Sequence, residues 1–332
     1  MYCAAPFTHM HLNISGEVNL CYGSNWTSRP VGNILKSDLW DLWNSPEAAE
    51  FRGTIRDGSF RYCTDCRMPE LHEAGSVPQD SDLSAVGNLV LAYDRTCNLT
   101  CPCCRLGVEV PGGTTMEIHE SLLGSKIWPH IRTLITSGCG EPLSSPLFWG
   151  LCSHLESVEL HRDFGLQLMT NGLLATARNV ERILRVVGRI VRIDVSIDAA
   201  CEETYLVNRR GGDWQVLMDN LAHLARTDIP LRLNFIVQAD NFREMPKFVE
   251  LASRFNASYI RFDAINNWST YTKDEYSKVA VHFPSHPQHE ALRVVLRDPV
   301  LADKRVHMAQ LSEDFFRTLS PLQTLHVFSA RM

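Results

Sequence analysis

Residues 93–105 read Tyr93-Asp94-Arg95-Thr96-Cys97-Asn98-Leu99-Thr100-Cys101-Pro102-Cys103-Cys104-Arg105, and they hold four of the eleven cysteines in the chain. Cys97, Cys101 and Cys104 have the spacing Cys-x3-Cys-x2-Cys. Three thiolates on one short loop can ligate three irons of a [4Fe–4S] cluster and leave the fourth iron open to a ligand. A structural zinc site, in contrast, is closed by four protein ligands. The stretch therefore predicts a reactive iron–sulfur centre.

Strand-like and helix-like segments alternate from about residue 88 onward, which is typical of βα units around a parallel sheet. The intervals between the strand-like segments are long enough for one crossover helix each. The clearest helix is predicted at Asp213–Ala225, where large apolar side chains recur at helical spacing. The six predicted strands are Asn88–Asp94, Ile131–Ser137, Gly165–Asn171, Arg189–Asp198, Leu231–Gln238 and Ser258–Asp263.

The last three of these strands alternate between an aliphatic face and a polar face. If helices cover the aliphatic faces, the polar faces point inward, whereas a closed eight-stranded barrel fills its interior with branched apolar side chains. The predicted fold is therefore α/β, a partial (βα)6 TIM-like barrel, and a sheet with one solvated face is the alternative. The inward charges could pair with one another or bind a ligand; they are Asp194, Arg232, Arg261 and Asp263.

The sequence predicts three regions. Residues 1–87 contain short β-like pieces, an acidic helix near Ser37–Phe51 and four cysteines, so we expect a small metal-stapled module. Residues 88–278 form the partial barrel, and residues 279–332 form a C-terminal helical tail without cysteine. The cysteines of the first region are Cys3, Cys21, Cys63 and Cys66.

Composition narrows the class of protein. The chain has 332 residues, 45% of them hydrophobic and 21% charged, which suffices for a large buried core. Its formal net charge is −6 and no run of like charges occurs, so we expect no nucleic-acid surface. No stretch of 18 uncharged apolar residues and no charged-then-apolar leader is present, which predicts a cytoplasmic protein without a membrane partner. Clustered thiols in a reducing compartment favour metal binding over disulfides.

Residues 88–265 resemble the radical SAM superfamily, and three further motifs carry the resemblance with the cysteine loop. Ser137-Gly138-Cys139-Gly140-Glu141-Pro142 follows the second strand and is similar to the Gly-Gly-Glu-Pro segment of that family. Thr170-Asn171-Gly172 follows the third strand, and Ser196-Ile197-Asp198 ends the fourth. The resemblance implies a [4Fe–4S] cluster that passes one electron to S-adenosylmethionine. Cleavage of that cofactor gives methionine and a 5′-deoxyadenosyl radical, which removes a hydrogen atom from the substrate.

The resemblance also implies which residues bind S-adenosylmethionine. The segment after the second strand would hold its methionine amino group through Gly138, Cys139, Gly140 and Glu141. Asn171, Ser196 and Asp198 would lie near its carboxylate and ribose. On the inward face of the fifth strand, Asn234 and Gln238 are candidates for the ribose side by their position in the alternation.

Two residues depart from the family pattern. Cys103 stands where the family usually has an aromatic residue, which leaves two choices for the third cluster ligand, and the spacing favours Cys104. Cys139 replaces the first glycine of Gly-Gly-Glu-Pro, and a small residue tolerated for its size is the simpler interpretation. The segment Arg209–Trp214 could be a phosphate-binding loop or could begin a helix with Asp213 as its N-cap. Cys152 is expected to be a buried apolar residue.

The first region resembles the SPASM or twitch auxiliary-cluster region of radical SAM enzymes, here placed before the barrel. The resemblance rests on the four cysteines together with the segment His9–Cys21, Val31–Ile34, Leu39–Ser45 and Arg52. It implies a second, auxiliary [4Fe–4S] cluster on Cys3, Cys21, Cys63 and Cys66. A four-thiolate zinc site is the alternative. His9 and His11 would pack beside this site, because four cysteines already suffice as ligands.

These features predict a radical SAM oxidoreductase that acts on a polar substrate such as a sugar, an aminocyclitol or a peptide, in natural-product tailoring. Net dehydrogenation would use the auxiliary cluster as electron acceptor. Epimerisation is the alternative and would use Cys201, just past the fourth strand, as hydrogen donor. From another class, a non-catalytic zinc-stapled binding protein would also account for the thiols. The expected partners are the substrate and an electron donor such as flavodoxin or ferredoxin.

Overall fold

A computed structural model describes residues 2–23, 26–64, 71–72, 77–136, 139–308 and 311. Cys66 and Gly138, both predicted site residues, lie outside this described part. The chain divides into two compact units, which we describe separately. The first unit comprises residues 1–100, 107–196 and 213–231, and the second comprises residues 101–106, 197–212 and 232–332.

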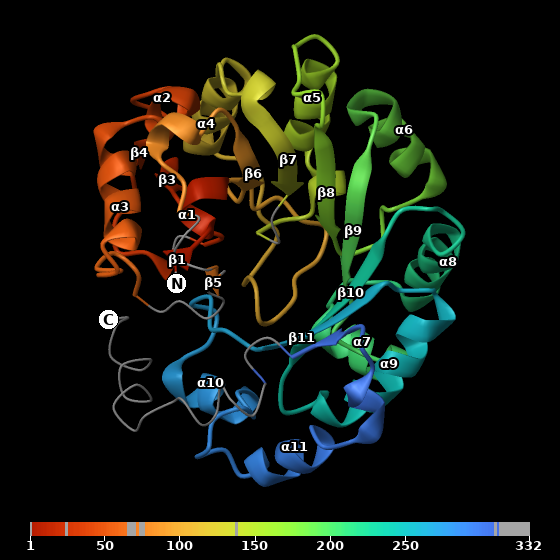
Figure 1. Ribbon diagram of the computed structural model, residues 1–332. Helices are drawn as coiled ribbons and strands as arrows, with labels where there is room; N and C mark the ends of the chain where they lie inside the picture. The colour runs from red at the N-terminus through yellow and green to blue at the C-terminus, as the bar shows by residue number, and fades with distance from the viewer. Residues whose placement is uncertain are drawn as a thin grey trace. The chain divides into compact units, whose positions relative to one another are not determined.

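Four parallel strands form the centre of the first unit (Figure 1). They are β6 (Val86–Leu91), β7 (Ile131–Thr136), β8 (Gly165–Thr170) and β9 (Ile190–Ser196). Each strand pairs in parallel with the next in chain order, which confirms four of the six predicted strands. The accompanying helices are α4 (Gly113–Leu123), α5 (Pro146–Leu155), α6 (Ala177–Val187) and α8 (Trp214–Leu224).

Side-chain caps fix where these helices begin. The Ser145 hydroxyl accepts from the backbone N–H groups of Leu147 and Phe148 at the start of α5. Asp213 accepts from the Val216 N–H at the start of α8, at 3.0 Å. The helix predicted at Asp213–Ala225 is therefore confirmed. Asp213 is its N-cap, which agrees with the second of the two interpretations of the segment Arg209–Trp214.

The N-terminal region continues the same sheet. Strand β2 (His9–Leu12) pairs in parallel with β6, placing His9 opposite Asn88. Strands β3 (Glu17–Asn19) and β4 (Gly32–Asn33) then extend the sheet in antiparallel fashion. The turn between β2 and β3 contains Gly16 at a φ of +78°, a conformation that glycine adopts without strain. The predicted module boundary at residue 87 thus lies within one sheet.

The single acidic helix predicted near Ser37–Phe51 is wrong, because the structure has two helices there. They are α2 (Leu39–Trp43) and α3 (Pro46–Arg56). Pro46 lacks the N–H that a continuing helix would need, and it disfavours a helical conformation at the preceding residue. Ser45 takes an extended conformation and caps α3 by accepting from the Ala48 N–H at 3.1 Å.

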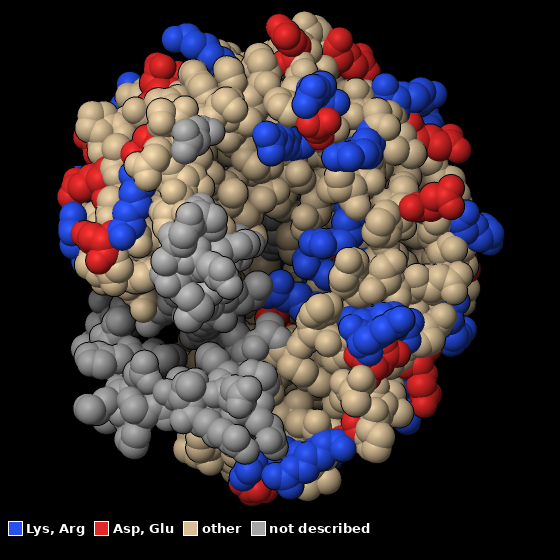
Figure 2. All heavy atoms as spheres, in the orientation of Figure 1, with Lys and Arg blue, Asp and Glu red and all other residues tan. Residues whose placement is uncertain are grey.

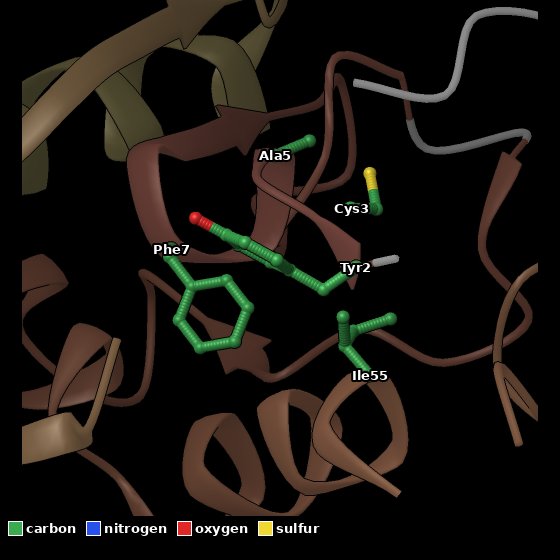
Figure 3. Packing of buried hydrophobic residues seen from close by; sticks show 5 residues of the cluster. All are labelled: Tyr2, Cys3, Ala5, Phe7 and Ile55. Carbon is green, nitrogen blue, oxygen red and sulfur yellow. The ribbon is translucent and has the colours of Figure 1, made fainter. Parts of the chain in front are cut away.

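Strand β1 (Tyr2–Cys3) and helix α1 (Ala5–Thr8) form a small apolar cluster with Ile55 of α3 (Figure 3). The rings of Tyr2 and Phe7 meet edge to face, with centroids 5.8 Å apart. Cys63 and Tyr22, the neighbour of Cys21, pack against this cluster. β1 pairs with β5 (Leu71–His72) in antiparallel register. The structure thus brings Cys3 and Cys63 to one apolar cluster.

Strand β10 (Leu231–Val237) belongs to the second unit from Arg232 onward, and there it pairs in parallel with β11 (Tyr259–Ala264). Strand β11 in turn pairs in parallel with β12 (Val306–His307). This confirms the fifth and sixth predicted strands. Phe235, Phe248 and Phe262 pack at centroid distances of 4.8–5.8 Å between these strands and helix α9 (Met245–Arg254). The helices are α7 (Glu202–Asn208), α9 (Met245–Arg254), α10 (Lys273–Val279) and α11 (His289–Val295).

Short 3₁₀ turns complete the described elements. In the first unit they are η3 (Asp80–Asp82), η4 (Trp128–His130) and η5 (Pro142–Ser144). In the second they are η6 (Phe242–Glu244) and η7 (Pro299–Ala302). No helix in the described residues is long and apolar enough to cross a membrane.

Charged side chains on the strand faces pair with one another within each unit. In the first unit, Arg192 contacts Asp194 at 2.6 Å, and the Gln167 amide donates to the same carboxylate at 2.6 Å. In the second, Arg261 contacts Asp263 at 2.5 Å. Figure 2 shows basic and acidic side chains interspersed on the face in view. Of the two outcomes left open for the strand charges, pairing is therefore observed for Asp194, Arg261 and Asp263.

Two histidines on β2 are buried as neutral groups. The His9 ring lies 2.8 Å from the Thr8 hydroxyl and 2.7 Å from the Asn88 amide. Burial lowers the pKa of His9 to about 4, and it lowers the pKa of His11 to about 4 as well. An unfolded histidine takes up a proton near pH 6.5, so the unfolded state binds more protons than the folded state in mildly acidic solution.

This difference predicts a pH-dependent stability. The contribution of each histidine is complete above pH 6.5 and is lost as pH falls toward 4, by about 1.4 kcal/mol between pH 8 and pH 5.5. His9→Gln should therefore flatten the dependence of the unfolding free energy on pH by about that amount, measured by anaerobic chemical denaturation. His307→Asn, at an exposed histidine, is the control. An unchanged slope in His9→Gln would contradict the prediction.

Candidate functional site

The sulfurs of the three predicted cluster ligands each accept an N–H hydrogen bond within their own unit. In the first unit, the Leu99 backbone N–H donates to Cys97 Sγ at 3.4 Å. In the second, Arg105 Nη2 donates to Cys104 Sγ at 3.3 Å and Arg209 Nη1 donates to Cys101 Sγ at 3.9 Å. Donors of this kind stabilise the thiolate form, which is the form that ligates iron.

Cys103 has a different environment from its neighbours. Its side chain packs against the apolar cluster of Ile265, Ala280 and Phe283 in the second unit. Burial raises the pKa of the Cys103 thiol far above its ordinary value. Burial also raises the pKa of Cys101, but the Arg209 guanidinium opposes that effect. The local environment thus favours Cys104 over Cys103 as the third ligand, in agreement with the spacing.

The loop after β7 packs onto the start of the cysteine loop in the first unit. The Glu141 backbone N–H donates to the Thr96 carbonyl at 2.7 Å. A Cβ on Gly140 would lie 2.6 Å from that carbonyl oxygen and 2.7 Å from the Asp94 carbonyl oxygen. Only glycine allows this approach, so the Gly140 position is sterically required. Cys139, one residue earlier, is half-buried.

The Glu141 carboxylate is buried and binds the next loop along the sheet. It accepts from the Thr170 hydroxyl at 2.8 Å and from the Asn171 backbone N–H at 2.5 Å. The Asn171 amide in turn donates to Asn98 Oδ1, between the first two cysteines, at 2.8 Å. The structure therefore brings the predicted residues Glu141 and Asn171 together. Their contacts to S-adenosylmethionine stay predictions.

Ser196 and Asp198 belong to different units. Ser196 is half-buried at the end of β9 in the first unit, whereas Asp198 is buried in the second. Asp198 Oδ2 contacts Arg209 Nη2 at 2.6 Å, and its Oδ1 accepts from the Ile236 backbone N–H at 2.8 Å. The Asp198 carboxylate thus binds two protein groups. The sequence analysis expected this residue to lie near the cofactor and did not predict these protein contacts.

Asn234 and Gln238 on β10 are both buried, but they differ in their partners. The Gln238 amide donates to Asn208 Oδ1. Neither polar atom of the Asn234 side chain has a hydrogen-bond partner among the described residues, although it is 5% exposed. A buried amide without a partner costs free energy unless a ligand or water satisfies it. Asn234 therefore fits a cofactor-binding residue.

Cys201 precedes α7 as its N-cap but gives that helix no side-chain cap. Its thiol lies 3.5 Å from Glu244 Oε1 and 3.5 Å from the Thr204 hydroxyl. Glu244 also accepts from the Thr204 hydroxyl and, at 2.6 Å, from the Ala200 backbone N–H. No sequence pattern indicates this role of Glu244, because it lies 43 residues from Cys201 in the chain.

Arg209 and Thr170 are further residues whose roles the sequence analysis missed. Thr170 could have been found, because it directly precedes Asn171 in the recognised motif. Arg209 stood in a segment interpreted only as a phosphate loop or a helix start. Nothing in the local pattern indicates that its side chain reaches Asp198 and Cys101.

Cys3 and Cys21 are buried and Cys63 is half-buried, and all three lie in the N-terminal part of the first unit. Cys63 also forms a β-bridge with Thr27. The fourth predicted ligand, Cys66, lies outside the described residues. Within the part of the chain that is described, no three histidine, cysteine or carboxylate side chains are grouped at metal-binding distance. The fit to iron–sulfur clusters therefore rests on the soft thiol donors and their N–H partners.

The α/β fold and the three-cysteine loop at the end of its first βα strand define an iron–sulfur enzyme. Residues 94–252 match the model of the radical SAM superfamily, and residues 3–67 match that of an iron–sulfur cluster-binding domain, SPASM. The chain therefore contains a radical SAM domain and a SPASM-type region. The predicted α/β fold class, with parallel strands joined by helices, is confirmed. The cofactors of the chain are S-adenosylmethionine, the [4Fe–4S] cluster that binds it, and an auxiliary iron–sulfur cluster.

A curated relative is the "Probable GTP 3′,8-cyclase" of Methanocaldococcus jannaschii, 26% identical over 176 residues. The match covers 52% of this chain and 57% of the relative, so the chain spans little more than half of that protein's length. Streptococcus suis SuiB bound to precursor peptide SuiA is 12% identical with a TM-score of 0.47, covering 83% of this chain and 64% of that one. Another similar structure is anSMEcpe with bound AdoMet, which is 17% identical with a TM-score of 0.42. That match covers 55% of this chain and 50% of the other.

The environments of Cys103 and Cys104 predict different effects of substitution. Cys104→Ala should abolish release of 5′-deoxyadenosine from S-adenosylmethionine under strong reductant and should remove about half of the iron, because one of three thiolate ligands is lost. Cys103→Ala should keep both, because it removes only an apolar contact. Iron content and chromatographic product analysis measure the two effects. Cleavage that persists in Cys104→Ala but is lost in Cys103→Ala would reverse the ligand assignment.

Proposed function

We propose that this radical SAM enzyme is an oxidoreductase that removes two hydrogens from a polar substrate, such as a sugar, an aminocyclitol or a ribosomally made peptide. The cluster and S-adenosylmethionine, when bound, supply a 5′-deoxyadenosyl radical that takes a hydrogen atom from an unactivated C–H bond. The substrate radical would then give one electron to the auxiliary cluster and one proton to a base. A flavodoxin or ferredoxin would supply the electron that starts the reaction.

The proposal assigns ligands to both clusters. Cys97, Cys101 and Cys104 would hold the first cluster, and the N–H donors to their sulfurs support this assignment. Cys3, Cys21, Cys63 and Cys66 would hold the second, supported by the position of Cys3 and Cys63 at one apolar cluster. A fully ligated cluster in an apolar setting suits an electron acceptor, because surroundings and ligation set its potential.

We assign the candidate S-adenosylmethionine-binding residues unit by unit. Cys139, Gly140, Glu141, Asn171 and Ser196 would contribute from the first, together with Gly138. In the second unit, the unpartnered amide of Asn234 is the strongest support for a bound polar ligand. Asp198 and Gln238 would orient neighbouring residues of the site, since both side chains already bind protein partners.

The contact between Cys201 and Glu244 carries the choice of dehydrogenation. Glu244 Oε1 lies 3.5 Å from the thiol sulfur and is an acceptor for its hydrogen. Redox-neutral epimerisation needs a thiol whose hydrogen points to the substrate. A thiol that donates to a neighbouring carboxylate is poorly oriented for this role, so the geometry favours loss of a second electron to the auxiliary cluster.

The charged side chains that pair on the strands support the proposal that the substrate is polar. The Arg192–Asp194 and Arg261–Asp263 pairs offer fixed dipoles with little net charge. Such surfaces bind hydroxyl and amide groups by hydrogen bonds without requiring an ionic substrate. Free sugars, aminocyclitols and synthetic peptides are therefore the first panel to screen by 5′-deoxyadenosine release.

For a substrate turned over from this panel, the product should be two hydrogens lighter and should take up no solvent deuterium at the abstracted carbon. Cys201→Ala and Cys201→Ser should both retain turnover. The serine variant is the sharper control, because its hydroxyl keeps a hydrogen bond to Glu244 but is a far weaker hydrogen-atom donor than a thiol. Mass spectrometry in light and heavy water gives the measurement.

An unchanged product mass in light water, one deuterium from heavy water and lost turnover in both Cys201 variants would instead establish epimerisation. The zinc-stapled binding protein is tested in the same preparation. Anaerobically purified protein should be brown with about eight irons if both clusters are four-iron cubanes. A colourless, zinc-loaded protein would contradict the enzyme proposal altogether.

A further inference from the structure

Arg209 lies at the end of α7 in the second unit, with its side chain only 13% exposed. Its guanidinium bridges two groups: Nη2 contacts Asp198 Oδ2 at 2.6 Å, and Nη1 donates to Cys101 Sγ at 3.9 Å. The third nitrogen, Nε, is buried without a partner among the described residues. One cation is thus held between a buried carboxylate and a buried thiol.

Asp198 is itself held rigidly. Its Oδ1 accepts from the Ile236 backbone N–H at 2.8 Å, and its carbonyl accepts from the side-chain amides of Asn208 at 3.3 Å and Asn241 at 3.0 Å. Its φ of +60° is uncommon for a residue other than glycine. A conformation of this kind persists only where the surroundings enforce it. The carboxylate therefore offers Arg209 a fixed anchor.

The turn after Arg209 restricts its backbone. The Arg209 N–H donates to the Tyr205 carbonyl at 2.7 Å, and the Arg209 carbonyl accepts from the Gly212 N–H at 2.8 Å. A Cβ on Gly212 would lie 2.6 Å from the Tyr205 hydroxyl, and Gly211 has a φ of +89°. The two glycines thus allow a tight turn that fixes Arg209 beside the cysteine. This accounts for the Arg-Arg-Gly-Gly segment without a bound phosphate.

We propose that Arg209, anchored by Asp198, is a positioning residue that donates an N–H···S bond to the Cys101 thiolate and raises the reduction potential of the iron–sulfur cluster ligated there. The proposal rests on the assignment of Cys101 as a cluster ligand under the proposed function. A nearby cation and a hydrogen bond to a ligand sulfur stabilise the more negative, reduced state of a cluster. Asp198 opposes part of this effect through its own charge.

The two members of the pair should therefore shift the potential in opposite directions. In Arg209→Gln, the ratio of reduced to oxidised cluster at a fixed applied potential should fall about tenfold. This corresponds to a reduction potential lowered by ~59 mV for a one-electron couple. In Asp198→Asn, an uncompensated arginine remains and the ratio should rise. Arg209→Lys should restore most of the wild-type value, because it keeps the charge. Arg210→Gln, at the exposed neighbouring residue, should leave the potential unchanged.

The measurement is an EPR-monitored redox titration of the iron-loaded full chain without S-adenosylmethionine. The cluster at Cys101 is identified beforehand as the one whose signal changes when S-adenosylmethionine is added. Shifts of the same sign in Arg209→Gln and Asp198→Asn would overturn the proposal, since general disruption of the fold predicts that result. An unmoved potential with weakened S-adenosylmethionine binding would also overturn it and would assign Arg209 to cofactor binding.

A further variant separates this proposal from the ligand assignment. If Cys101→Ala keeps the S-adenosylmethionine-responsive cluster, Cys101 is not a ligand and the proposed site itself is wrong. If Cys101→Ala loses that cluster while the arginine and aspartate variants leave the potential unchanged, the ligand assignment stands and only the role of Arg209 fails.

Discussion

The buried carboxylate of Glu141 is the interaction on which the arrangement of the first unit's loops depends. A buried carboxylate is costly unless donors satisfy it, and here the donors come from the Thr170 hydroxyl and the Asn171 N–H. Its own backbone N–H reaches the Thr96 carbonyl. One residue therefore joins the loops that follow β6, β7 and β8. Because parallel strands end at the same edge, these three contacts gather the predicted cofactor residues of the first unit there.

This packing also explains why one glycine of the familiar Gly-Gly-Glu-Pro pattern is kept and the other is replaced. The Gly140 position faces two backbone oxygens at distances that no Cβ tolerates. Cys139 precedes the tight contact and carries a side chain that is half-buried there. The departure from the family pattern thus falls where the structure accepts a side chain, and the glycine that allows the loops to touch is the one retained.

The sequence predicted local periodicity well and long-range pairing poorly. All six predicted parallel strands are present, and the last three of them show the alternation of apolar and polar residues on which their prediction rested. Asp213 is the N-cap that one of the two interpretations of its segment predicted from capping chemistry. The break between α2 and α3 was readable from Ser45-Pro46 but was overlooked. Arg209–Asp198 and Cys201–Glu244 could not be predicted, because no local pattern specifies which side chains meet across a loop or between residues 43 apart. Burial of an unpartnered Asn234 likewise became visible only in the structure.

The surroundings of the cysteines distinguish the proposed cluster ligands from the cysteines that act as apolar residues. Cys152 on α5 is 2% exposed, and burial raises its pKa to about 12, so it behaves as a small hydrophobic residue. Cys103 has the same character against its apolar cluster, although it adjoins Cys104 in the chain. Cys101 and Cys104 each face an arginine instead. An apolar wall thus lies beside one thiol and a guanidinium lies beside the next, and the proposed ligands Cys101 and Cys104 are those that face a positive charge, because only a thiolate binds iron.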